Sequence, residues 1–339
     1  IPWFEYTTQR HPKLLERQLE YIKTVVSELN CYGNIIFEVC NEPGGDWPDD
    51  NNAPSADEVD EWLSLLINCI QKTEQSLPNH HLIAGQSAFS YKLPTEKMNA
   101  KDVHQFTEKS FYKMAFDIVN MHPLSNMWYK SKNYDLGRFM MGQLHLCQFR
   151  DYCLEVYPEY KPLNLDEDNA AARFMDTRGW IIHRKRAWTS LMCGAHYSVI
   201  DFSINKHMET GTKDSQKHIR RWMKYLSQFI HSIDLGLAKP LPRCVKMTPK
   251  HTCHSVLAVE NEDYLVYLAD HRENEKRSQA TSIEGDIIID LPKGNYVFRF
   301  YSPENGKYSR RHSIRGGGEV KIALPSFIED IALRITKKI

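Results

Sequence analysis

The sequence predicts an α/β domain followed by an all-β antiparallel sandwich. Short apolar segments with strand-like composition alternate with amphipathic helical segments from residue 11 to about residue 233. From Leu241 onward, helical spacing gives way to short strands separated by turn-forming residues. We therefore expect two domains, at residues 1–238 and 239–339.

The composition limits the kinds of partner that the protein can bind. Its 339 residues can bury a large core, and its 43 Lys and Arg residues are balanced by 43 Asp and Glu residues. This balance provides no field that would attract nucleic acid or an anionic membrane surface, and it suits a neutral polymer better. No stretch approaches the roughly 20 apolar residues of a membrane span.

Periodicity places the elements of the first domain in alternating order. Apolar residues at helical spacing predict helices at residues 11–30, 56–76, 134–156, 170–191 and 215–233. Between them, apolar runs bounded by turn formers predict strands within residues 34–42, 81–89, 116–123, 161–167 and 193–203.

The first of these strands leads into the tripeptide Asn41-Glu42-Pro43. Proline cannot continue a hydrogen-bonded ladder, so we expect the strand to stop at Glu42. A carboxylate at the end of a buried strand costs free energy unless it is paired or functional, and this makes Glu42 a candidate catalytic residue. The alternative is a strand-end glutamate that is followed by a helix-capping loop.

A second strand ends in acidic residues, at Asp166-Glu167-Asp168. Alternation along a strand places Glu167 on the opposite face from both aspartates, so only one side can face a site. Two acidic strand ends suggest a pair of catalytic carboxylates. The alternative for the aspartates is an ion pair with Arg184 or Arg186 of the following predicted helix.

These two strand ends and the alternating strand–helix pattern between them resemble the clan A glycoside hydrolases, a group of cellulase-like TIM barrels that includes glycoside hydrolase family 5. The resemblance implies that Glu42 is the acid/base, that Glu167 is the nucleophile with Asp166 as second choice, and that Asn41 hydrogen-bonds the sugar. It implies retaining hydrolysis of β-glycosidic bonds in an oligo- or polysaccharide, a (β/α)8 barrel, no cofactor and an extracytoplasmic location.

Five further side chains are candidate substrate contacts. His122 ends the strand at 116–123, where the resembled families commonly place an aromatic residue or a histidine, and Trp128 lies just beyond it. Trp47 lies in the loop that follows Glu42, and His196 and Tyr197 lie in the last predicted strand. An aromatic ring beside a carboxylate can stack on a sugar face, and the alternative for each residue is packing or solvent exposure.

Only about strands 4 to 8 of the resembled barrel are represented, because five strand candidates precede the sandwich and a barrel needs eight. We therefore expect strands 1 to 3 from upstream sequence or from another chain, since a half barrel leaves sheet edges unpaired. No residue can be assigned to the arginine that the resembled families supply from their second strand. The alternatives to an active enzyme are a non-catalytic carbohydrate-binding protein on a barrel scaffold and an inactive glycosidase fragment.

The eight cysteines show no CxxC spacing, which argues against a zinc or redox motif, and we expect no metal site. In an oxidising compartment, Cys244 and Cys253 would be able to close a hairpin. The neighbouring His251 and His254 can imitate a metal cluster by their spacing.

The C-terminal domain is predicted to pack against the barrel in a structural role rather than to bind sugar. Its turn signals are at residues 292–295 and 303–306. Its predicted strands are at residues 255–259, 264–269, 286–291, 296–301, 319–324 and 331–335.

Overall fold

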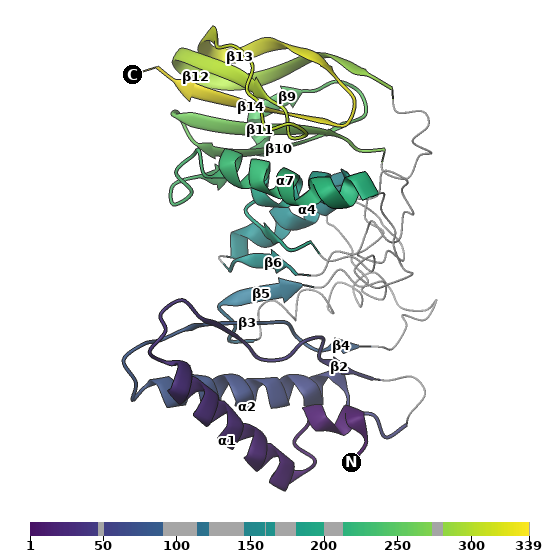
Figure 1. Ribbon diagram of the computed structural model, residues 1–339, viewed down its shortest axis with the longest axis vertical. Helices are drawn as coiled ribbons and strands as arrows, with labels where there is room; N and C mark the ends of the chain where they lie inside the picture. The colour runs from purple at the N-terminus through teal and green to yellow at the C-terminus, as the bar shows by residue number, and fades with distance from the viewer. Residues whose placement is uncertain are drawn as a thin grey trace. The chain divides into compact units, whose positions relative to one another are not determined.

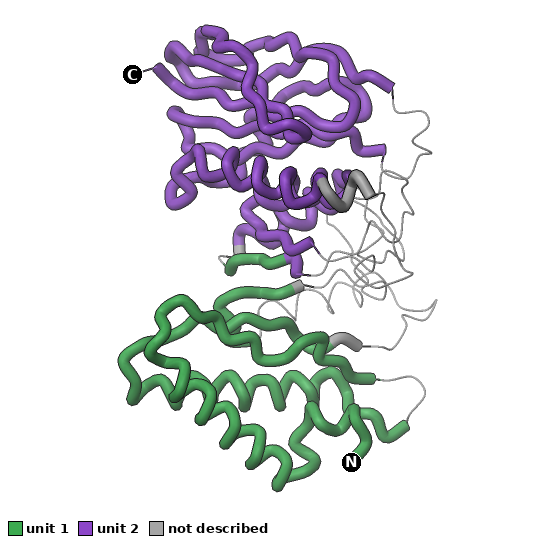
Figure 2. Tube along the Cα trace, in the orientation of Figure 1, with its two compact units in different colours: residues 1–141, 161–164 green, residues 142–160, 165–339 purple. Residues whose placement is uncertain are grey.

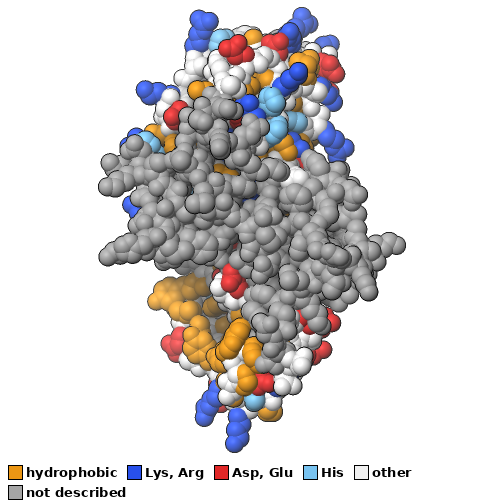
Figure 3. Space-filling model, turned by 90° about the vertical axis from the view of Figure 1, so that its right-hand side faces the viewer, with side chains coloured by type: hydrophobic (Ala, Val, Ile, Leu, Met, Phe, Trp, Pro, Cys, Tyr) orange, Lys and Arg blue, Asp and Glu red, His pale blue; other side chains and the backbone are white. Residues whose placement is uncertain are grey.

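A computed structural model of the chain describes residues 1–46, 51–90, 114–121, 146–159, 161–166, 181–199, 213–272 and 281–338. The chain forms two compact units (Figure 2): unit 1 holds residues 1–141 and 161–164, and unit 2 holds residues 142–160 and 165–339. The described part of the chain contains no helix that is long and apolar enough to cross a membrane. On the surface that Figure 3 shows, acidic and basic side chains are interspersed, in keeping with the balanced composition.

A five-stranded sheet forms the first layer of the fold (Figure 1), in the order β1 (Ile36–Glu38), β3 (Leu82–Gly85), β5 (Ile118–Met121), β6 (Leu163–Leu165) and β7 (His196–Tyr197). Ile36 pairs with Leu82 and Ala84 with Ile118, both in parallel register. Strand order follows chain order, as in a segment of a (β/α)8 barrel. The predicted α/β class, with about strands 4 to 8 of a barrel, is confirmed.

The helices of unit 1 cover one face of its strands. They are α1 (Pro12–Leu29) and α2 (Ala56–Glu74), preceded by the 3-10 helix η1 (Trp3–Thr7). The N-terminus of α2 carries a capping box, in which the Ser55 side chain accepts from the Glu58 backbone N–H and the Glu58 side chain accepts from the Ser55 backbone N–H. Leu63 and Ile67 of α2 pack in one buried cluster with Ile83 of β3. This cluster fixes the side of the sheet that faces the helices.

Unit 2 contains the helices α4 (Leu146–Val156), α6 (Ile181–Met192) and α7 (Lys213–Ile230), with the 3-10 helices η3 (Tyr157–Glu159) and η5 (Pro242–Cys244). Trp188 of α6 packs against Phe229 of α7 and stacks on Tyr267 of the C-terminal sheet, with ring centroids 5.1 and 5.2 Å apart. The described helices therefore share a core with the C-terminal strands. Unit 2 contains both these helices and that sheet, so the division into compact units does not test the predicted domain boundary between residues 238 and 239, which stays a prediction.

The C-terminal strands form a seven-stranded antiparallel sheet in the order β13-β12-β14-β11-β10-β8, with β9 paired to β12. The edge of β12 that faces away from β13 changes partner along its length: Ile288 pairs with Met247 of β9, and Phe298 pairs with Ile335 of β14. The sheet therefore folds over a shared core, as expected of a sandwich. The strands are β8 (Lys239–Pro240), β9 (Val245–Met247), β10 (Thr252–Val259), β11 (Asp263–Asp270), β12 (Ile283–Tyr301), β13 (His312–Phe327) and β14 (Asp330–Lys337).

The predicted turn at residues 292–295 is wrong, because β12 continues through it. The register with β13 shifts between Leu291 and Gly294, which marks a bulge rather than a chain reversal. Gly316 lies opposite Gly294, and a Cβ atom there would collide with the carbonyl oxygen of Pro292. The Pro and Gly residues that signal a turn in the sequence thus allow the strand to bend from one layer to the other.

The possible disulfide between Cys244 and Cys253 is not formed in this structure, in which all eight cysteines are free thiols. Cys244 belongs to the core between the layers of the sandwich, whereas Cys253 belongs to the cluster formed with α6 and α7. The two thiols therefore lie in different cores, and Cys253 has Cys147 of α4 as its neighbour.

Candidate active site at the carboxyl ends of the parallel strands

In barrels of alternating parallel strands and helices, the reactive groups lie at the carboxyl ends of the strands. In unit 1, this edge is formed by the residues at and after the ends of β1, β3 and β5. Glu42 lies on the segment that follows β1, and the buried side chains of Gln86 and Asn120 lie at the ends of β3 and β5.

Glu42 occupies a strained backbone position. Its φ angle is 48°, in the left-handed region that residues other than glycine rarely adopt. This conformation costs roughly 1–2 kcal/mol, and such strain concentrates at functional sites. The strand itself stops at Glu38, so the prediction that it runs to Glu42 is wrong. Among the described residues, one further bond continues the ladder, from the Val39 N–H to the Ala84 carbonyl, before the chain turns at Glu42.

The segment after Glu42 is anchored to the start of α2. Gly44–Gly45 form β2, which pairs in parallel with β4 (Phe89–Ser90). A Cβ atom at Gly45 would lie 2.5 Å from the backbone nitrogen of Ala56, so only glycine permits this approach. The Asp46 N–H donates to the Pro54 carbonyl at 2.7 Å. These contacts fix where the chain leaves Glu42.

Polar side chains at the ends of the neighbouring strands are buried, and buried polar groups normally have hydrogen-bond partners. The Asn164 side-chain amide of β6 donates to the Asn120 side-chain oxygen of β5 at 3.2 Å. Gln86 is 5% exposed, and its Oε1 atom has no donor among the described residues. Gln86 and Asn120 were not selected from the sequence, although each directly follows or ends an apolar run, the same signal that singles out Glu42.

Cys40 lies two residues before Glu42, and burial raises the pKa of its thiol to about 11, with the charge of Glu38 acting in the same direction. The thiol is therefore protonated at neutral pH and is no candidate nucleophile. Asn41 is exposed beside it. The part of the chain that the structure describes holds no group of three or more His, Cys, Asp or Glu side chains that could bind a metal ion.

In unit 2, β7, the last strand of the parallel sheet, carries His196 and Tyr197, which were predicted to contact the substrate. The Tyr197 hydroxyl lies 2.7 Å from Nδ1 of the buried His183, and its ring packs against the cluster around Trp188 of α6. These contacts favour a packing role for Tyr197. His196 is exposed, as expected because successive side chains of a strand point to opposite faces and the next residue, Tyr197, packs inward. Sugar contact by either residue stays a prediction.

Asp166 directly follows β6 and is half-buried. The suggestion that Arg184 pairs with Asp166 or Asp168 is wrong, because its guanidinium binds Asp330 of the C-terminal sheet through two hydrogen bonds of 2.9 and 2.8 Å. The Arg186 guanidinium lies over the ring of Phe149, 4.8 Å from its centroid. The candidate residues Glu167, His122, Trp47 and Trp128 lie outside the described residues, so their positions stay predictions.

The arrangement of parallel strands, covering helices and C-terminal antiparallel sheet is the fold of barrel glycoside hydrolases. A glycoside hydrolase family 5 protein from Bacteroides vulgatus ATCC 8482 has this fold, with a TM-score of 0.60 and 14% sequence identity over 95% of this chain and 67% of its own. A second solved structure, described as a glycoside hydrolase, has a TM-score of 0.59 and 12% identity over 96% of this chain and 69% of its own. No protein-family model and no curated protein matches the sequence.

Proposed function

We propose that the protein is a glycoside hydrolase that cleaves β-glycosidic bonds with retention of configuration. The observation that carries this proposal is the strained Glu42, which follows the first parallel strand of a sheet with the fold of barrel glycosidases. A charged residue in a left-handed conformation needs a reason to persist, and catalysis supplies one.

In the proposed reaction, Glu167 attacks the anomeric carbon while Glu42 gives its proton to the departing glycosidic oxygen. The first product leaves as an alcohol, and the sugar stays bound to Glu167 as an ester. Glu42 then takes a proton from water, whose oxygen attacks the anomeric carbon and releases Glu167. This double displacement needs the two carboxyl groups to lie about 5–5.5 Å apart.

Two polar side chains at the carboxyl edge of the parallel strands suit a hydroxylated substrate. The acceptor Oε1 of Gln86 is buried and has no donor among the described residues, so a sugar hydroxyl would satisfy it. Asn41 is exposed and would supply both a donor and an acceptor. We assign these two residues to substrate binding.

Azide separates the two carboxylate roles in one experiment. The variants Glu42→Ala and Glu167→Ala are incubated with an aryl β-glycoside that has a good leaving group, with and without azide. We expect Glu42→Ala to regain turnover and to form the β-glycosyl azide, because azide replaces water on the covalent intermediate. We expect Glu167→Ala to form the α-glycosyl azide by direct attack.

The control variant is Glu28→Ala, which removes an exposed carboxylate on α1 and should keep wild-type turnover. Wild-type activity in the Glu42→Ala variant without azide, or the same azide anomer from both variants, would contradict the role assignment. Binding of oligosaccharides without any hydrolysis by the wild type would favour a non-catalytic carbohydrate-binding protein instead.

We also propose that further parallel strands pair with β1, either from another segment or from another chain. Among the described residues, β1 lies at the edge of its sheet. Ile36 and Leu82 are register partners that are 53% and 51% exposed on the face away from the helices. Apolar side chains also gather on the surface of unit 1 in the view of Figure 3. Cross-linking from a cysteine placed at Ile36 would identify the segment that lies beside it.

A further inference from the structure

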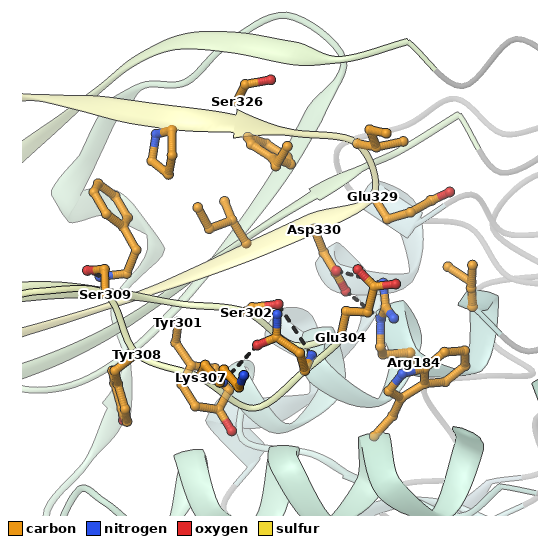
Figure 4. A pocket seen from close by; sticks show the side chains of 18 of the residues that line it. Arg184, Tyr301, Ser302, Glu304, Lys307, Tyr308, Ser309, Ser326, Glu329 and Asp330 are labelled. Atoms are coloured by element: carbon orange, nitrogen blue, oxygen red, sulfur yellow. Dashed lines mark hydrogen bonds and ion pairs between the residues drawn. The ribbon is translucent and has the colours of Figure 1, made fainter. Parts of the chain in front are cut away.

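A cavity of about 780 Å³ lies within unit 2, between helices α6 and α7 and the C-terminal sheet. It is lined by Arg184 of α6, Trp222 of α7, the connection between β12 and β13, and the turn between β13 and β14. Figure 4 shows Arg184, Glu304 and Asp330 gathered at one end of the cavity. Its volume falls within the roughly 300–1,000 Å³ of sites that bind small molecules.

Charge at this end of the cavity is balanced by pairs. Arg184 and Asp330 form a bidentate ion pair in which each side chain is 2% exposed, and the Tyr267 hydroxyl also donates to Asp330 at 2.9 Å. The Lys185 ammonium lies 2.8 Å from the Glu329 carboxylate. Of the remaining charged lining residues, Glu304 is offset by Lys307. The charges of the lining residues therefore balance once Lys185, which pairs with Glu329 from outside the lining, is counted, and a balanced site gives no preference for phosphate, carboxylate or amine ligands.

Aromatic residues, among them Trp222, Phe300 and Tyr308, form part of the remaining cavity wall, beside serine and aliphatic residues. The guanidinium of Arg184 covers one face of Trp222, with Cζ 4.6 Å from the ring centroid. Tyr308 and Phe300 are half-buried lining residues, and the guanidinium of Arg299 lies 4.2 Å from the centroid of Tyr308. Aromatic rings held in place by such contacts offer apolar surface at low entropic cost.

We propose that this cavity binds a neutral oligosaccharide. Pyranose rings carry apolar C–H faces and a rim of hydroxyls, which matches aromatic walls beside a carboxylate. Glu304 is exposed and lies beside the Arg184–Asp330 pair, so its two oxygens are available to accept from neighbouring hydroxyls. The site lies within unit 2 and requires neither Glu42 nor Glu167, so it goes beyond the proposed hydrolysis.

The test is calorimetric titration of the full chain carrying Glu42→Gln and Glu167→Gln, which prevents turnover, with four tetrasaccharides. These are the β-1,4-linked tetramers of glucose, mannose, xylose and galactose. We expect at least one of them to bind, and we expect Glu304→Ala or Tyr308→Leu, added separately, to weaken that binding at least tenfold. The second substitution removes the ring but keeps an apolar side chain, and circular dichroism verifies the fold of each variant.

Matched controls are Glu319→Ala, which removes an exposed carboxylate of β13, and Tyr21→Leu, which removes an exposed tyrosine of α1. Neither should change binding. The inference is overturned if no tetrasaccharide binds, or if Glu304→Ala and Tyr308→Leu bind as tightly as the parent, since binding then takes place elsewhere. Hydrolysis is assayed separately on the wild type, so an inactive protein that binds through Glu304 would refute the proposed function and leave this inference standing.

Discussion

The buried ion pair between Arg184 and Asp330 allows a direct test of how strongly the C-terminal sheet stabilises α6. Both side chains are buried, and two hydrogen bonds of 2.9 and 2.8 Å join them. Burial alone would lower the pKa of Arg184, but the charge and hydrogen bonds of Asp330, together with the interactions with Tyr267 and Glu304, raise that pKa above its usual value. Arg184→Met leaves Asp330 buried with one described donor, the Tyr267 hydroxyl.

Removing one member of a buried pair costs about 3–5 kcal/mol, because the remaining charge stays desolvated. We therefore expect Arg184→Met to lower the free energy of unfolding of the full chain by that amount. Asp330→Asn, which keeps the shape of the side chain, should cost a similar amount. The double variant removes both charges and should recover at least half of the loss of either single variant.

Urea unfolding curves of the wild type and the three variants, followed by circular dichroism, measure these differences. The reasoning fails if Arg184→Met costs less than about 1 kcal/mol, since that is the range of exposed ion pairs. It also fails if the double variant loses the sum of the two single losses, since independent effects would mean that the two charges do not interact.

Three further predictions concern unit 1. The hydrogen bond between His81 and Glu74, 2.5 Å long, raises the pKa of His81 above its usual value. The stabilisation that this bond gives the folded protein is therefore complete below about pH 6.5, and it is lost as the pH rises through the raised pKa. The stability difference between wild type and Glu74→Gln should shrink over this range in urea titrations, and a difference that grows with pH would contradict it. Gly45→Ala should lower the thermal unfolding midpoint by several degrees, because a Cβ there meets backbone at 2.5 Å, whereas Gly33→Ala, with open space around it, should change it little. Glu42→Gly should stabilise the chain by up to about 1 kcal/mol relative to Glu42→Ala, because glycine adopts a positive φ without strain. Neither variant should turn over substrate. Equal unfolding midpoints for the two variants would show that the backbone at residue 42 is not strained.

Periodicity located the described helices and the order of the parallel strands well. Helices α1 and α2 lie within one residue and two residues of the predicted ends, because apolar residues at helical spacing also form the buried cluster of unit 1. The strands are shorter than predicted. Apolar composition persists after the end of β1 at Glu38, as far as Val39 and Cys40, which pack against the helix cluster of unit 1 although they lie outside the strand.

Partners that lie far apart in the sequence were not predictable. Arg184 and Asp330 are separated by 146 positions, and the sequence offered the nearer Asp166 and Asp168 instead. Only the fold of the C-terminal sheet back onto α6 brings Asp330 to the guanidinium. Likewise, the bulge at residues 291–294 has the composition of a turn, and the difference depends on whether the flanking residues stay paired with β13. Burial of Gln86 was hidden for the same reason, since it depends on neighbouring strands.

Helix α6 has consequences for how this protein can be divided or recombined. Its residues from Ile182 to Ser190 are all buried, including Arg184, Lys185 and Arg186, and the C-terminal sheet supplies much of that cover. A chain cut at residue 238 would remove the sheet that packs on Trp188 and would leave Arg184 and Lys185 without their acidic and carbonyl partners. Attempts to exchange the C-terminal sheet for that of another protein should therefore transfer α6 with it, because the helix and the sheet that covers it share one core.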